Sequence, residues 1–151
     1  MMPTEAYYTF SLTVAEGKRL IARGVAQLPQ VQRALEDGIV IVTRSTTSGY
    51  VLEELLGEPV DRRSFVTGKT LPSGHPERGK LLSADTPEVV LRKGERGEGG
   101  PELISELKAG DVIIKSPNAL KYDEGIVGYL IGAADGGTVG KYLGPAHGKH
   151  L

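Results

Sequence analysis

The sequence predicts one α/β domain spanning residues 1–151, with three layers, a largely parallel sheet and helices on both faces. The first observation is Ile39-Val40-Ile41-Val42, an apolar β-branched run that is too short for a helix and fits a strand buried on both faces. The second is the polar segment 43–49 that follows, leading into an apolar helical pattern over 50–56 that ends at Gly57. Helical patterns also precede the strand, and this alternation favours α/β over segregated layers.

The helical patterns before the strand have clear start and stop signals. Thr13 and Glu16 have the spacing of a capping box. Behind them one set of positions recurs at helical spacing (Val14, Gly17, Leu20, Ile21, Gly24, Val25, Leu28), with Lys18, Arg19, Arg23 and Gln27 on the other face. Pro29 ends or restarts this helix, and a second short helix runs to Gly38.

The rest of the chain supplies further strands. The patterns predict strands over 88–93, 111–115 and 126–131, a helix from Pro101 to Gly110, and a glycine-rich turn over 133–140. Residues 144–151 show no closing element, so we expect the chain to be short at its C-terminus relative to its fold.

Composition narrows the classes of function. The chain has 18 basic and 19 acidic residues, a net charge of -1, and shows no basic stripe, so nucleic acid is not an expected partner. It has no cysteine, which excludes disulfides and thiolate metal sites. No apolar run approaches the ~18 residues that span a bilayer, and the first residues do not resemble a leader, so we expect no membrane partner and a cytoplasmic location.

The first candidate site follows the strand at 39–42. Its residues are Arg44, Ser45, Thr46, Thr47 and Ser48. Ligands of open α/β sheets bind beyond the carboxyl ends of strands, where backbone N–H groups, hydroxyls and a guanidinium can hold a phosphate or carboxylate. The alternative is that Thr47 or Ser48 only caps the next helix.

Two more strand ends carry polar groups. Lys115 could pair with a substrate acid and Asn118 could bond a carbonyl or hydroxyl, although both also fit an ordinary strand end and turn. The glycine-rich loop contributes Gly136, Gly137 and Thr138 as a second anion cradle, or as a plain turn. Asp135 beside it is the best-placed carboxylate for acid–base chemistry.

Other polar residues carry weaker signals. His147 and His150 lack a third ligand, so no metal site is predicted, and no cofactor is indicated. Glu53 and Glu54 fit the solvent side of their helix, with a role as a base as the alternative.

The segments at 38–57 and 110–140 resemble the sugar-phosphate isomerase and coenzyme A transferase-like superfamily. That group includes ribose-5-phosphate isomerase, glucosamine-6-phosphate deaminase and methylthioribose-phosphate isomerase, which have a Rossmann-like fold. Residues 41–48 resemble the strand and loop that hold phosphate there, and residues 115–120 with 125–128 are similar to a Gly-Ala-Asp segment that precedes a glycine turn and strand. The whole chain looks like an uncharacterised family of this kind, with a Thr-Thr loop, a Lys-x-x-Asn-Ala segment and a Gly-Gly-Thr-x-Gly loop.

The resemblance implies two functions of different class. One is an isomerase- or transferase-like enzyme that binds a small anionic metabolite, phosphorylated or carboxylated. The other is a non-catalytic regulatory or assembly protein. It is favoured by Asn118, which stands where the isomerases carry a catalytic aspartate and which cannot transfer a proton. In both cases we expect a homo-oligomer.

Overall fold

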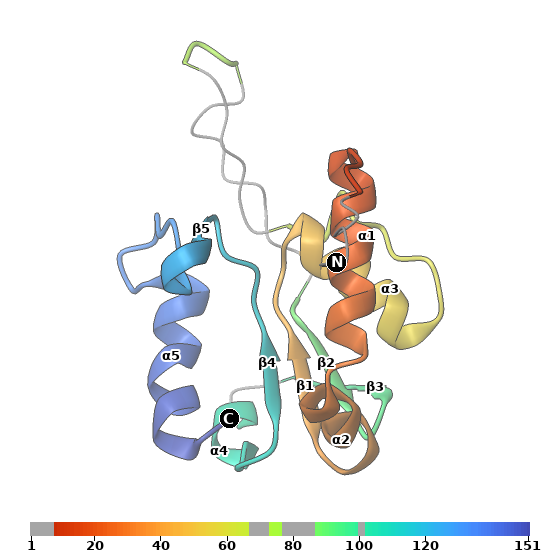
Figure 1. Cartoon of the computed structure of the whole chain (residues 1–151). Helices are drawn as coiled ribbons and strands as arrows, with labels where there is room; N and C mark the ends of the chain where they lie inside the picture. The colour runs from red at the N-terminus through yellow and green to blue at the C-terminus, as the bar shows by residue number, and fades with distance from the viewer. Residues whose placement is uncertain (1–7, 67–72, 77–86, 100–101) are drawn as a thin grey trace, which may run out of the picture.

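The computed structural model describes residues 8–66, 73–76, 87–99 and 102–151 (Figure 1). In this part of the chain a four-stranded sheet has the strand order β3-β2-β1-β4, and β5 and β6 form a separate two-stranded hairpin. The helices are α1 (Val14–Ala26), α2 (Pro29–Asp37), α3 (Thr46–Leu56), α4 (Leu103–Glu106) and α5 (Gly137–Lys149), with a 3₁₀ turn at Tyr122–Glu124. The strands are β1 (Ile39–Val42), β2 (Val89–Arg92), β3 (Glu95–Gly97), β4 (Val112–Ile114), β5 (Ala119–Lys121) and β6 (Ile126–Gly128).

The predicted three-layer, largely parallel, Rossmann-like fold is wrong. β1 pairs in parallel only with β4, with Ile41 opposite Ile113, and it pairs antiparallel with β2 on its other side. β3 and β5–β6 add further antiparallel pairs. All four residues of β1 are buried, as predicted. Burial on both faces requires a central strand with covered faces, but it does not fix the direction of the neighbouring strands.

Successive residues of β1 serve two separate apolar clusters. Val40 and Val42 pack with Leu52 of α3 and Phe65, while Ile39 and Ile41 pack with residues of α4 and α5 that include Tyr142. This division follows from the two-residue period of a strand. It places α3 on one face of the sheet and the start of α5 near the other face.

Both ends of β1 are fastened by polar contacts. At its start, the carboxylate of Asp111 accepts hydrogen bonds from the amides of Ile39 (2.8 Å) and Lys108 (2.9 Å), and only 1% of Asp111 is exposed. At its end, the amide and hydroxyl of Thr43 both donate to the carbonyl of Ile114, at 3.0 and 2.9 Å. These contacts fix the parallel pair β1–β4 at both rims.

The predicted signals at the first helices are confirmed, with one shift. The capping box of Thr13 and Glu16 is formed, α2 begins at Pro29, and Gly57 ends α3 in the left-handed region at φ 68°. However, α3 begins at Thr46, so most of the predicted loop 43–49 is the first turn of that helix. Ser45 caps it by accepting the amide of Ser48 at 2.9 Å.

α5 was not predicted, and it supplies the closing element that residues 144–151 were expected to lack. The predicted turn over 133–140 leads into it through Gly136, whose φ is 80°. Its C-terminal end is fixed by Lys149, whose ammonium donates to carbonyls of Ile104, Ser105 and Leu107 at 2.8–3.0 Å. Pro101, the predicted start of a helix, lies outside the described residues. Within them, α4 begins at Leu103.

Large apolar side chains are exposed at Tyr8, Phe10, Leu12 and Leu143, and in two further segments of the described residues. The first is α1, where Val14, Leu20 and Ile21 are 76%, 59% and 53% exposed. The second is the run 117–135, which contains the β5–β6 hairpin and is exposed throughout. No helix in the described ranges combines the length and apolar character needed to cross a bilayer.

Candidate functional site

A cleft of about 910 Å³ lies at the rim of the sheet where β1 ends. Four separate parts of the chain line it: Arg44 after β1, residues 87–90 at the start of β2, residues 96–99 with Leu103, and the beginning of α5 (Asp135, Gly137, Thr138, Lys141). They meet because β1 ends at this rim and its antiparallel neighbour β2 starts there. The cleft is therefore built from segments that are distant in sequence.

Glu88 organises the polar groups of this cleft. Its carboxylate accepts hydrogen bonds from the ammonium of Lys141, at 2.9 Å, and from the buried hydroxyl of Tyr142. Burial, with the neighbouring negative charge of Glu88, raises the pKa of Tyr142 to about 12. Burial by itself lowers the pKa of Lys141, but the bonds to Tyr142 and Glu88 outweigh it and the net shift is upward. Lys141 and Tyr142 thus both stay protonated at neutral pH.

Lys115 lies close to this group without lining the cleft. Its ammonium sits over the ring of Tyr129, 5.1 Å from the ring centre. Burial lowers the pKa of Lys115, and the charge of Glu88 opposes that shift only partly. A cation that is partly removed from water in this way gives up its proton more readily than a surface lysine does.

The start of α5 is shaped by close backbone contacts. The carboxylate of Asp135 accepts the amide of Gly137 at 2.8 Å, and the amide of Gly140 donates to the carbonyl of Gly136 at 2.9 Å. A side chain at Gly140 would collide with the carbonyl of Asp135. The glycine-rich loop therefore turns tightly into the helix, and the amide of Gly137, the first of α5, is satisfied by Asp135.

The hydroxyls predicted to hold an anion are mostly used within the protein. The hydroxyls of Ser45, Ser48 and Ser116 are mutual neighbours at 2.8–3.1 Å, and Ser48 is fully buried. Thr46 accepts the ammonium of Lys18 at 2.6 Å. This cluster ties the end of β1 to the end of β4. One residue of the segment does cap the next helix, but it is Ser45 and not Thr47 or Ser48, the two considered from the sequence.

The predicted residues accordingly fall into two groups. Arg44, Asp135, Gly137 and Thr138 line one cleft, and Gly136 caps the helix beside them. Ser45, Thr46, Thr47 and Ser48 do not line it. Asn118 also lies elsewhere, because its side-chain oxygen accepts the amide of Leu130 at 2.8 Å and holds the hairpin together.

Sequence reasoning missed Glu88, Lys141 and Tyr142. No spacing links residue 88 to residues 141 and 142, and Glu88 was read only as the first residue of a strand. The contact arises because an antiparallel β2 starts where β1 ends. A prediction of strand direction would have placed Glu88 at the same rim as Arg44.

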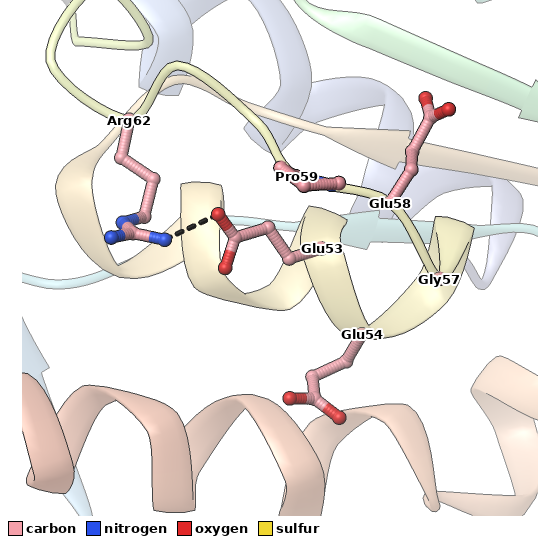
Figure 2. A pocket seen from close by; sticks show the side chains of 6 residues that line it. All are labelled: Glu53, Glu54, Gly57, Glu58, Pro59 and Arg62. Carbon is pink, nitrogen blue, oxygen red and sulfur yellow. Dashed lines mark hydrogen bonds and ion pairs between the residues drawn. The ribbon is translucent and has the colours of Figure 1, made fainter.

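A second hollow, of about 460 Å³, lies beside α3 (Figure 2). Its charged lining includes Glu53, which accepts hydrogen bonds from Arg62 and from Arg19 of α1. The guanidiniums of Arg19 and Arg62 lie 4.7 and 4.2 Å, respectively, from the ring centre of Tyr50. Figure 2 shows Arg62 reaching toward Glu53. Because the Glu53 carboxylate is already hydrogen-bonded to Arg19 and Arg62, these charged groups form a structural junction of α1, α3 and the following loop.

Neither metal chemistry nor homology adds to this description. Within the described ranges, no group of three or more His, Asp or Glu side chains is arranged to hold a metal ion. No family model, curated protein or solved structure matches the chain. The functional argument therefore rests on the geometry of the cleft.

Proposed function

We propose that the protein binds a small anionic metabolite, phosphorylated or carboxylated, in the cleft between Arg44 and the start of α5. The observation that carries this proposal is the convergence of Arg44 with Gly137 and Thr138 on one cleft. A guanidinium offers paired donors to a phosphate or carboxylate. The amide of Gly137 is already bonded to Asp135, so the contribution of α5 comes from the hydroxyl of Thr138 and the positive end of the helix dipole.

Three carboxylates of the described residues line the cleft; Glu98 is exposed, where water screens its charge, and the other two already have donors. Glu88 already accepts from Lys141 and Tyr142, and Asp135 accepts from the amide of Gly137. Each of these negative charges is thus partly neutralised by the protein itself. An anionic group placed between Arg44 and α5 would meet donors on both sides.

The same cleft supports the two predicted functions to different extents. Lys115 is the described group best suited to act as a base near the cleft, because burial lowers its pKa. The hydroxyl of Tyr142 stays protonated at neutral pH but already donates to Glu88, so it positions that carboxylate rather than the ligand. Lys115 favours an isomerase- or transferase-like enzyme, whereas the engagement of Asn118 in the hairpin argues against the bond to a substrate carbonyl or hydroxyl that was considered for it. The regulatory or assembly function remains the alternative, and the cytoplasmic location stays a prediction.

Binding measurements with matched variants test the proposal. Titration calorimetry with inorganic phosphate, a sugar-phosphate panel and acyl-coenzyme A should find at least one ligand. Arg44→Ala should weaken it by about 10–100-fold, since a hydrogen bond to a charged group contributes about 1.5–3 kcal/mol. Arg33→Ala removes the same charge from an exposed position of α2 outside the cleft lining and should leave affinity unchanged. Equal affinities in the wild type and Arg44→Ala would remove the site.

Turnover assays then separate the two functions. An enzyme should convert the bound metabolite, and Lys115→Met should abolish conversion while leaving binding within about threefold, since the base acts on the reaction more than on ground-state binding. A ligand that binds tightly and is recovered unchanged would support the regulatory alternative.

A further inference from the structure

α1 has its polarity reversed relative to an ordinary surface helix. Two of its cations face the protein: Arg19 pairs with Glu53 and Glu54, and Lys18 donates to Thr46. Its large apolar residues Val14, Leu20 and Ile21 face outward and only the small Ala22 is buried, although an amphipathic helix normally turns its apolar side to the core. Figure 1 shows α1 alongside α3, on the side of the molecule away from α5. Such an arrangement leaves an apolar face without a partner inside the chain's described part.

We propose that this outward face of α1 is a homodimer interface, packed antiparallel against α1 of a second copy of the chain. The face, named here the α1 stripe, consists of Gly17, Leu20, Ile21 and Gly24 of the helix, together with Leu28, which directly follows its C-cap Gln27. The three large residues are 59%, 53% and 40% exposed. A Cβ added at either glycine would meet no described atom within 4 Å, so both positions are open from outside.

The α1 stripe is complementary in shape to itself. A two-fold axis between residues 22 and 23 sets Ile21 opposite Gly24 of the second copy. The same axis sets Leu28 opposite the second copy's Gly17. Each bulky side chain then enters the gap left by a glycine, and the missing side chains let the two helices approach closely. An isologous contact of this kind requires a surface to match itself, which a generic partner would not require.

The size of the apolar surface also fits a dimer. Val14, at 76% exposure, lies at the edge of the α1 stripe and extends it. Taking roughly 150–200 Å² for a fully exposed large apolar side chain, Val14, Leu20, Ile21 and Leu28 together present on the order of 400 Å². A standard interface buries about 800 Å² per partner, of which about 55–65% is apolar, or roughly 450–500 Å². The stripe therefore supplies most of the apolar share that a stable dimer needs.

The β5–β6 hairpin is the competing surface, and it is less suited to self-association. Its side chains alternate between two faces of a two-stranded ribbon, so its apolar area is divided. Leu120 is opposite Val127, whereas Ile126 is opposite Lys121. A charged residue thus interrupts one face of the ribbon, while the α1 stripe has only apolar and glycine positions.

Sedimentation and light scattering of the full chain test the proposal. We expect a concentration-dependent dimer. Ile21→Lys should raise the dissociation constant of the dimer by at least about 30-fold, because two charges would be buried per dimer. Ile126→Lys makes the same change at a similarly exposed position of the hairpin (55%) and should leave the dimer intact. A chain that stays monomeric at about 200 μM, or a dimer lost in Ile126→Lys but kept in Ile21→Lys, would overturn the inference.

A second variant separates the interface from folding. Gly24→Leu fills the gap that receives Ile21 and should weaken the dimer by at least tenfold. The change also replaces a poor helix former by a good one. At protein concentrations below the dissociation constant, where the chain is monomeric, the variant should therefore have a Tm equal to or higher than that of the wild type. A dimer that tightens in this variant would contradict the antiparallel packing. Phosphate binding to the cleft is measured separately, so failure of the dimer and failure of the ligand site remain distinguishable.

Discussion

Replacing Glu53 by glutamine should remove the main polar connection between α1 and α3. The Glu53 side chain is 9% exposed, and its carboxylate accepts hydrogen bonds from Arg19, from Arg62 and from the amide of Val60 at 3.2 Å. Glutamine has nearly the same volume, so no cavity is created. The change removes the negative charge and puts an NH₂ group where an acceptor is needed.

The expected loss follows from the exposure of the three partners. Hydrogen bonds to a charged group contribute about 1.5–3 kcal/mol, and breaking a fully buried ion pair costs about 3–5 kcal/mol. Here Arg19 and Arg62 are 32% and 38% exposed, so water screens both charges and can solvate them after the change. We therefore expect Glu53→Gln to lower the free energy of unfolding by about 2 kcal/mol, at the lower end of the range.

The pH dependence gives a second, independent signature. Burial acts to raise the pKa of Glu53, but hydrogen bonds from Arg19, the Val60 amide and Arg62 outweigh it, so the pKa in the folded protein lies below the ordinary 4.5. A carboxylate with a lowered pKa stabilises the fold fully above its unfolded-state pKa, and that contribution disappears as pH falls through the folded-state value. The difference between the wild type and Glu53→Gln should thus be largest near neutral pH and shrink in acid.

Urea unfolding followed by circular dichroism at about pH 7 and about pH 3.5 measures both effects. Glu54→Gln is the matched control: Glu54 is 25% exposed and shares Arg19, and its loss should cost less than about 1 kcal/mol. The reasoning would be refuted by a Glu53→Gln variant no less stable than Glu54→Gln, or by a difference that does not shrink in acid.

Two further predictions concern the start of α5. Gly140→Ala places a methyl group against the carbonyl of Asp135 and should destabilise the protein by about 1–3 kcal/mol. Gly144→Ala has no atom within 4 Å of the new Cβ and should stabilise the protein by about 0.5–1 kcal/mol. Thermal denaturation of the two variants and the wild type measures both effects. Tyr142 has its pKa raised from 10 to about 12, chiefly by burial and then by Glu88. Its contribution to stability is therefore complete below pH 10 and lost as pH rises through about 12, and ultraviolet titration should find its ionisation in that range, with Tyr142→Phe lacking the step.

The local elements could be predicted because their signals are local. The capping box at Thr13 and Glu16, the restart at Pro29 and the stop at Gly57 each depend on contacts within one or two turns. The sheet could not be predicted in the same way, because the direction of β2 depends on how the chain crosses residues 57–88, where patterns are weak. α5 was missed because glycines at 140, 144 and 148 lower helix propensity, and tertiary contacts of Tyr142 and Lys149 compensate.

The candidate site lies at the predicted edge of the sheet even though the predicted sheet topology was wrong. The rule that ligands gather beyond the carboxyl ends of strands depends on neighbouring strands ending together, and one parallel pair is enough for that. β1 and β4 are such a pair, so Arg44 and Lys115 both follow strand ends at this rim. The rule did not anticipate that an antiparallel neighbour delivers its first residues to the same rim. Glu88 arrives in this way, and it provides the carboxylate that positions Lys141 and Tyr142 at the cleft. In mixed sheets, residues just before antiparallel strands should therefore be searched together with those just after parallel ones.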